Sequence, residues 1–170
     1  MCISIGVITY FEFDKMNYML CSPSPRHFVV LGSWINDAEQ CLRWAGPKLT
    51  FPFQAQTLPS SLETEVCDSY ALVDAAGELV GFGQIFRREP ETGHLGRIIV
   101  DPKRRQQGVG QQLCKELINA GVRRHAFRSM TLWVFVDNPP AIHLYASLGF
   151  APEAREGMEG CMFMRLNVVV

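Results

Sequence analysis

Residues 95–110, LGRIIVDPKRRQQGVG, predict a short buried strand that turns into a helix. Residues 97–100 are mostly β-branched and are followed by a turn signal, as is typical of a strand. Pro102 cannot continue the strand, because it has no amide to donate. Gly108 and Gly110 then open a helix. Its apolar face is formed by Val109, Leu113 and Leu117, with Cys114 and Ile118 beside them.

The glycines at this junction indicate a phosphate-binding loop. The first turn of a helix has unpaired amides and a partial positive charge. Because glycine has no Cβ, an anion can approach those amides closely. Arg105 adds a charge at the rim. An ordinary turn beside a solvated basic patch is the alternative interpretation.

Two common phosphate loops do not match the segment. A dinucleotide-binding fingerprint requires a third glycine where this chain has Leu113. A P-loop requires lysine after its last glycine, whereas Gly110 is followed by Gln111. The phosphate group would therefore belong to another kind of ligand site.

The pattern Arg/Gln-x-x-Gly-x-Gly/Ala after an apolar strand resembles the GNAT superfamily of acetyl-CoA-dependent N-acetyltransferases. Residues 138–150, NPPAIHLYASLGF, are similar to a second segment of that family, N-x-x-A-x-x-L-Y-x-x-L-G-F, with every fixed position present. The resemblance covers residues 66–166 well and residues 19–65 loosely. It implies an N-acetyltransferase.

Hydrophobic periodicity and turn residues predict the order of elements. Strands are expected at 18–21, 67–73, 79–86, 95–100, 131–136 and 160–166, and helices at 25–35, 38–44, from 109 and from 138. A polar loop is expected at 87–93 and a link at 151–159. The resemblance implies a single-domain α/β GNAT-like fold over residues 16–170. Its mixed central sheet would splay between the fourth and fifth core strands, with flanking helices, leaving a V-shaped cleft.

Composition limits the class of protein. A chain of 170 residues with 48% hydrophobic and 19% charged residues suits one globular domain. The net charge of −1 predicts neither a nucleic-acid surface nor a membrane-binding face. The six cysteines are scattered without a C-x-x-C pair, which argues against a metal site and favours reduced thiols in a cytoplasmic protein.

Residues 1–15 form a nearly uncharged apolar stretch. The stretch is too short to span a bilayer, and it lacks the positive start and cleavage site of a signal peptide. We interpret it as an N-terminal extension, with an extra edge strand as the alternative. An exposed edge there could pair with a second subunit in a homodimer.

The resemblance implies roles for residues along the cofactor, acetyl-CoA. Its pyrophosphate would lie on the amides of Gln106, Gln107, Gly108, Val109, Gly110 and Gln111, near Arg105. Ile98, Ile99 and Val100 would pair with the pantetheine arm as an added strand does. Asn138 would contact the cofactor, and an amide of the strand would meet the developing oxyanion.

Tyr145 is the candidate acid of the reaction. It follows Asn138 by two helical turns, so the two side chains share a face. A phenol is protonated at neutral pH and can donate to a leaving thiolate. Glu91 and His94, which lie just before the central strand, are candidate bases, and a bound water is a third candidate. For Tyr145 alone the alternative is a core tyrosine.

The acceptor is less defined by the sequence. The helices at 25–35 and 38–44 would wall its site in this family. Trp34, Trp44, Phe51 and Phe53 favour ordinary core packing, with an apolar slot for the acceptor as the alternative. The predicted reaction is direct attack on acetyl-CoA by a primary amine, which could be a small amine, an amino-acid derivative or a protein N-terminus. A non-catalytic acyl-CoA-binding or sensor module is the alternative function.

Overall fold

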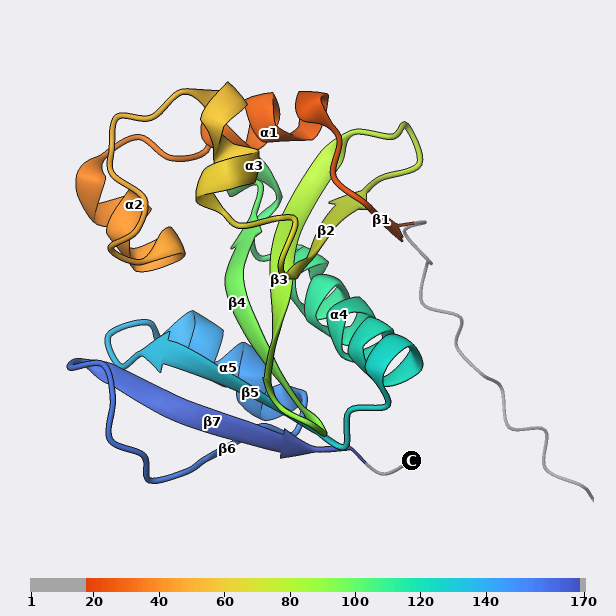
Figure 1. Cartoon of the computed structure of the whole chain (residues 1–170), viewed down its shortest axis with the longest axis vertical. Helices are drawn as coiled ribbons and strands as arrows, with labels where there is room; N and C mark the ends of the chain where they lie inside the picture. The colour runs from red at the N-terminus through yellow and green to blue at the C-terminus, as the bar shows by residue number, and fades with distance from the viewer. Residues whose placement is uncertain (1–17, 169–170) are drawn as a thin grey trace, which may run out of the picture.

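The computed structural model describes residues 18–168, so the expected extension at 1–15 lies outside the described residues. The chain forms one seven-stranded sheet in the order β1-β2-β3-β4-β5-β7-β6, with helices on its faces (Figure 1). The strands are β1 Met19–Cys21, β2 Asp68–Val73, β3 Leu79–Glu89, β4 Thr92–Val100, β5 Ser129–Phe135, β6 Ala151–Pro152 and β7 Cys161–Asn167. Only β4 and β5 pair in parallel, which confirms the predicted mixed sheet.

Helices lie where the sequence signals predict them. They are α1 Pro25–Gly32, α2 Ala38–Ala45, α3 Leu58–Ser61, α4 Val109–His125 and α5 Pro139–Ser147. Ser24 caps α1 with proline at the first helical position, and the Asp37 side chain caps α2 by accepting from the Gln40 amide. The helix α1 stops at Gly32, short of the predicted end at residue 35.

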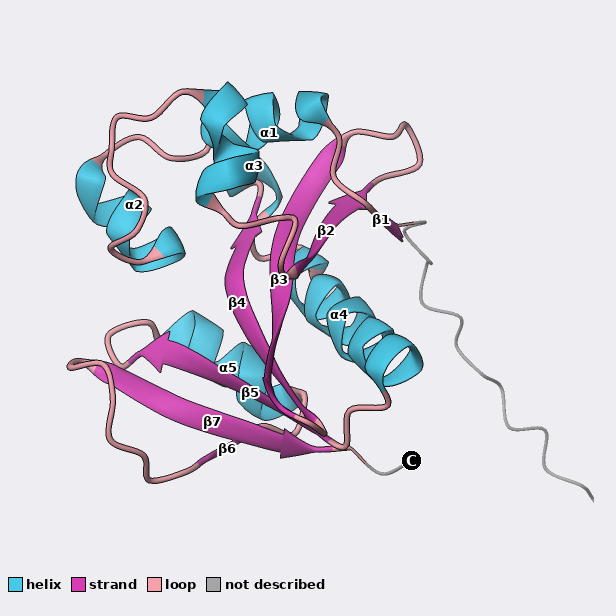
Figure 2. Cartoon of the chain, in the orientation of Figure 1, coloured by secondary structure: helices cyan, strands magenta, loops and turns pink. Residues whose placement is uncertain are grey.

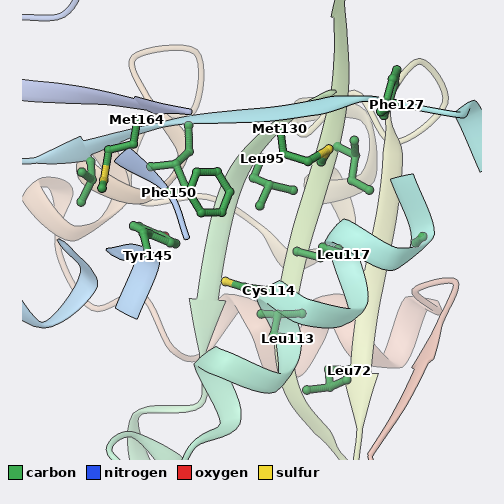
Figure 3. Close-up of a cluster of buried hydrophobic side chains, with 14 of the residues drawn as sticks. Leu72, Leu95, Leu113, Cys114, Leu117, Phe127, Met130, Tyr145, Phe150 and Met164 are labelled. Carbon is green, nitrogen blue, oxygen red and sulfur yellow. The ribbon is translucent and has the colours of Figure 1, made fainter. Parts of the chain in front are cut away.

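Two apolar clusters lie on opposite faces of the sheet. One packs α4 and α5 against β3, β4, β5 and β7 around Leu113, Leu117 and Met130, which are fully buried (Figure 3). The other packs α1, α2 and α3 against Phe82 of β3. Helices therefore cover both faces of the sheet and stabilise its shape.

The split separates the two halves of the sheet. β4 and β5 pair only from Thr92–Ser129 to His94–Thr131, which is three residue pairs. Beyond His94 the strands diverge, so that β5 and β7 cross the lower half of the view while β3 and β4 rise away from them (Figure 2). The edge of β4 at residues 95–100 therefore lacks a partner strand on that side. The predicted splay between the fourth and fifth core strands is confirmed.

The prediction of a loop at residues 87–93 is wrong. β3 continues to Glu89, and β4 begins at Thr92, because Arg87 pairs with Gly93 and Glu89 pairs with Thr92. The side chains of residues 87–89 are exposed and polar, as in a loop, although these residues belong to strand β3. The predicted link at 151–159 also contains the short strand β6.

Candidate active site

Two cavities open where the sheet divides. The larger cavity has a volume of about 460 Å³, and the smaller cavity has a volume of about 420 Å³. Both are lined by the same five residues at their junction: Arg43, Trp44, Ile98, Phe135 and Asn138. The cavities therefore meet across the gap between β4 and β5.

Tyr145 lies on α5 beside Phe150 at the edge of the buried apolar cluster (Figure 3), and it lines the larger cavity. Its ring packs edge-on against Phe150 with centroids 6.0 Å apart. The hydroxyl forms no hydrogen bond within residues 18–168, yet no buried side-chain oxygen or nitrogen there lacks a partner. The hydroxyl oxygen must therefore reach the open space of the cavity.

The environment of Tyr145 keeps its phenol protonated. Burial of the side chain, with a smaller effect of the neighbouring Cys114 thiol, raises the pKa of Tyr145 well above its usual value. Burial also raises the pKa of Cys114 to about 12. A protonated phenol that faces a cavity can donate a hydrogen bond or a proton to a ligand.

His94 lies in β4 rather than in a loop, and it lines the larger cavity with Tyr145. Its Nδ1 is 2.9 Å from the Thr131 hydroxyl, which itself lies 3.3 Å from the carbonyl oxygen of Gly93. Because the hydroxyl donates to that carbonyl, it accepts from Nδ1–H of His94. This tautomer leaves Nε2 as a free hydrogen-bond acceptor.

Burial is the main cause that lowers the pKa of His94 to about 4, and Arg88 and Arg155 lower it further. The imidazole is therefore neutral near pH 7. A neutral imidazole with this pKa accepts hydrogen bonds but is a weak base.

The low pKa of His94 predicts a loss of stability in acid. Because the folded pKa of about 4 lies below the ordinary 6.5, the unfolded chain binds more protons between these values. Stability from neutral His94 is complete above 6.5 and falls as the pH drops toward 4. We expect the free energy of unfolding in urea to fall about 2 kcal/mol more in the native chain than in His94→Gln between about pH 7.5 and pH 5. Equal losses in the two proteins would contradict this assignment.

Glu91 lies in the exposed turn between β3 and β4. Its carboxylate pairs with Arg128 at 3.3 Å. It lines neither the larger nor the smaller cavity, so the structure does not bring Glu91 together with Tyr145 and His94.

The carboxylate that does line the larger cavity is Glu63, just after α3, which the sequence did not single out. It pairs with Lys48 at 3.0 Å and with Arg97 at 3.7 Å. The hydrogen bond from Lys48 is the main cause that lowers the pKa of Glu63. Glu63 is therefore ionised and already engaged by cations.

A bulge in β4 places Arg97 in the wall of the larger cavity. The register shifts opposite residues 82–84 of β3, and Arg97 takes a φ of 51°. Its carbonyl oxygen accepts from Trp44 Nε1 at 2.8 Å. Its guanidinium donates to the Leu62 carbonyl at 2.7 Å and to the Gln84 side chain at 2.8 Å. The bulge thus turns the backbone of residues 97–98 toward α2 and fixes it there.

The smaller cavity contains part of the predicted cofactor set. Ile98, Ile99, Arg105 and Asn138 line it. Val100 and residues 106–111 do not line it. The Asn138 oxygen caps α5 by accepting from the Ala141 amide at 3.3 Å, which leaves the Asn138 amide group to donate to a ligand.

The glycine loop lies next to Arg105 and opens α4. Gly108 caps the helix with a φ of 79°, and a Cβ there would meet no atom within 4 Å. Gln112 is the first residue of this segment whose amide donates a backbone hydrogen bond, to the Gly108 carbonyl oxygen at 3.0 Å. The amides of residues 106–111 can therefore donate to a ligand. Gly110 has another role, because a Cβ there would lie 3.0 Å from the Leu144 side chain of α5.

All four aromatic residues near the expected acceptor side pack in or against the apolar cluster beneath α1, α2 and α3, as predicted, and two of them also line a cavity. Phe51 and Phe53 pack edge-on at 6.0 Å and belong to the core beneath α1, which confirms core packing for both. Trp34 is a buried core residue that also lines the smaller cavity, and Trp44, which packs against the core, lines both cavities. The aromatic walls that the sequence did not reveal come from strands: Phe86, Trp133 and Phe135.

Residues 18–168 contain no cluster of three histidine, cysteine or acidic side chains that could hold a metal ion. Within the same range, none of the helices has the length and apolarity needed to traverse a membrane. The five cysteines of this part of the chain are all free thiols.

Sequence comparison gives one family match. The model of the acetyltransferase (GNAT) family matches residues 32–150. A UPF0039 protein of Schizosaccharomyces pombe is 30% identical over 84 residues, which are 49% of this chain and 55% of that protein. An uncharacterized N-acetyltransferase of Methanocaldococcus jannaschii is 33% identical over 105 residues, 57% of this chain and 44% of that protein. The chain thus spans about half the length of these relatives.

Solved structures share the fold at low identity. A spermidine N-acetyltransferase from Vibrio cholerae in complex with CoA and spermine has a TM-score of 0.71 at 16% identity, over 88% of this chain and 95% of that one. An aminoglycoside acetyltransferase in complex with coenzyme A has a TM-score of 0.71 at 17% identity, over 89% of this chain and 95% of that one. Both likenesses extend over nearly the whole described domain.

Proposed function

The chain belongs to the acetyltransferase (GNAT) family, and from this premise we propose that it transfers an acetyl group from acetyl-CoA to a primary amine. One observation carries the proposal: the phenol of Tyr145 and the imidazole of His94 line the same cavity at the split in the sheet. That cavity joins a second one that reaches Arg105 beside the glycine loop. A cofactor could therefore extend from the loop to Tyr145.

The cofactor site would use main-chain donors and one cation. The free amides of residues 106–111 at the start of α4 would hold the pyrophosphate, with Arg105 at its rim. The unpaired edge of β4 at Ile98, Ile99 and Val100 would bond the pantetheine arm. Asn138, which lines both cavities, would donate its amide to the same arm where it passes between them.

The transfer would proceed by direct attack. The amine nitrogen forms a bond to the thioester carbonyl carbon, and a main-chain amide of the β4 bulge stabilises the oxyanion. The carbon–sulfur bond then breaks, and the leaving thiolate takes a proton from the Tyr145 hydroxyl. The raised pKa keeps the Tyr145 phenol protonated, but it also makes the phenol a weaker acid than a thiol. The hydroxyl therefore stabilises the leaving thiolate by donating a hydrogen bond, and water returns to the phenol the proton that passes to sulfur.

The proton of the attacking amine would leave through water. Glu91 is outside the cavity, and Glu63 is held by Lys48 and Arg97. His94 offers Nε2 as an acceptor, but its pKa near 4 makes it a weak base. We therefore assign to His94 the positioning of the amine or of a relay water, and to water the removal of the proton.

Acetyl-CoA binding is tested by thermal melting. Ligand at about 100 times its Kd stabilises the folded state by about 2.7 kcal/mol. For a domain of this size that corresponds to a rise in Tm of about 5–10 °C. CoA should compete for the same site, whereas ATP at the same concentration serves as the control nucleotide. No shift at millimolar acetyl-CoA would contradict the proposal.

A non-catalytic acyl-CoA-binding module is the second candidate, because the cavity holds no carboxylate free to act as a base. The two functions differ in CoA release from acetyl-CoA with a panel of primary amines. Amine-dependent release indicates an enzyme. Tight binding without release over the whole panel indicates a binding module.

A further inference from the structure

The larger cavity carries an excess of positive charge. Four of its lining residues are cations and one is a carboxylate: Arg43, Lys48, Arg88, Arg97 and Glu63. An acceptor that is itself a polycation would add further positive charge to this wall. The charge balance therefore favours an acceptor that brings a negative group with its amine.

Three of the four cations already have carboxylate partners. Arg43 forms a two-pronged pair with Asp137 at 2.6 and 3.0 Å. Glu63 pairs with both Lys48 and Arg97. Each of these three cations is therefore already engaged by a protein carboxylate, with which a ligand would have to compete in order to bind it.

Arg88 is the exception. Among residues 18–168 no carboxylate oxygen lies within 4.0 Å of its guanidinium, which is instead 5.7 Å from the Phe86 ring centroid. The side chain is exposed, and it lines the cavity. Arg88 is thus a cavity cation whose donors are available to a ligand.

Contacts with Phe86 place Arg88 and His94 at the same end of the cavity. Phe86 pairs with His94 across β3 and β4, and its ring lies 6.5 Å from the imidazole. The register shifts between Arg87 and Glu89, but the Arg88 guanidinium lies 5.7 Å from the Phe86 ring centroid and both residues line the cavity, so the two side chains lie together. Arg88 is also one of the charges that lower the pKa of His94, in agreement with this placement.

The remaining walls of this end are apolar. Phe86 of β3 and Trp133 of β5 line the cavity, together with Met158 from the segment between β6 and β7 and Trp44 from α2. An amine placed near Tyr145 and His94 would thus have apolar surface around its carbon atoms. Among the cations that line this cavity, Arg88 is the one without a carboxylate partner in the described residues, so it is available to a second polar group of the acceptor.

We propose that the acceptor is a primary amine that also carries a carboxylate, and that Arg88 binds this carboxylate. The inference rests on the proposed acetyl transfer and narrows its substrate class to amino acids and related zwitterionic amines. The planar guanidinium suits the two oxygens of a carboxylate. Polyamines and aminoglycosides, which lack a negative group, are expected to be poor acceptors.

The test uses pairs of amines that differ only in the carboxylate: phenylalanine with phenethylamine, and lysine with cadaverine, with spermidine as a polycation. Acetyl-CoA consumption gives kcat and KM for each. In at least one pair we expect kcat/KM to be about tenfold or more higher for the amino acid than for the amine that lacks its carboxylate. This ratio corresponds to the free energy of an exposed charge-assisted hydrogen bond. Arg88→Gln should remove this preference through KM, and Arg88→Lys should keep part of it.

The matched control is Arg87→Gln. Arg87 neighbours Arg88 on β3 but leaves the opposite face, where it contacts His125 at 3.0 Å. Its substitution should leave the preference for acids intact. An equal or better rate with the decarboxylated amines or with spermidine, or an unchanged preference in Arg88→Gln, would overturn the inference while leaving acetyl transfer standing.

Calorimetry of the same pairs with the CoA-loaded protein separates the two proposals. If no amine is acetylated but the acids bind and lose affinity in Arg88→Gln, the assignment of Arg88 holds and the transfer reaction is wrong. If the acids neither react nor bind, the inference about the acceptor is overturned as well.

Discussion

Replacing Tyr145 by phenylalanine is expected to lower kcat by roughly 10²–10⁴-fold, the usual contribution of a positioned acid. The variant loses one oxygen atom and keeps the ring that packs against Phe150. The hydroxyl has no protein partner among the described residues, so its removal leaves no side-chain donor or acceptor of the protein unpaired. Folding and acetyl-CoA affinity should therefore change little.

Turnover and cofactor binding are measured separately to establish this. Initial rates at saturating acetyl-CoA give kcat, and calorimetry gives the Kd of CoA. Tyr70→Phe is the matched control, because Tyr70 lies in β2 and lines neither the larger nor the smaller cavity. A kcat of Tyr145→Phe close to that of the native chain would remove Tyr145 from the acid role.

Replacing Arg97 by methionine is expected to destabilise the fold by about 3 kcal/mol, because its charged guanidinium donates hydrogen bonds to the Leu62 carbonyl and to the Gln84 side chain. The Arg97 side chain is 10% exposed and donates to the Gln84 side chain, which is fully buried. Methionine has a similar length but no donor. The Gln84 oxygen would then be buried without a partner, and such a group costs about 1–3 kcal/mol.

The matched control is Arg88→Met. Both guanidinium groups lie near the ring of Phe86, at 5.5 Å for Arg97 and 5.7 Å for Arg88, but Arg88 is exposed. Substitution at Arg88 should change stability by no more than about 0.5 kcal/mol. Urea unfolding measures both variants. Equal costs would show that the buried contacts of Arg97 do not stabilise the bulge.

Much of the fold was predictable because its signals are local. Asp37 and Pro25 mark the starts of α2 and α1, and the apolar repeat from Val109 marks α4. The predictions fail where a β-strand carries exposed polar side chains. Arg87 and Glu89 have the composition of a loop, yet antiparallel partners place them in β3.

The candidate site was predictable in part. The motif residues Tyr145 and Asn138 line the cavity because Tyr145 lies within α5 and Asn138 caps the start of the same helix. Glu63, Phe86 and Arg88 were missed because they reach the cavity through strand register and through a loop distant in sequence. A single sequence contains no local signal that these three residues line one cavity, because their proximity depends on how separate segments pack.

The short pairing of β4 with β5 has a consequence for the choice of acyl donor. The main chain of β4 between residues 95 and 100 keeps hydrogen-bonding capacity that no other strand uses. A donor with secondary amides along an extended arm can satisfy it, whereas a compact donor such as acetyl phosphate cannot. Because this selection is made by peptide groups, side-chain substitutions along that edge should alter it little. The acceptor end, built from side chains, is then free to diverge in specificity while the donor stays the same.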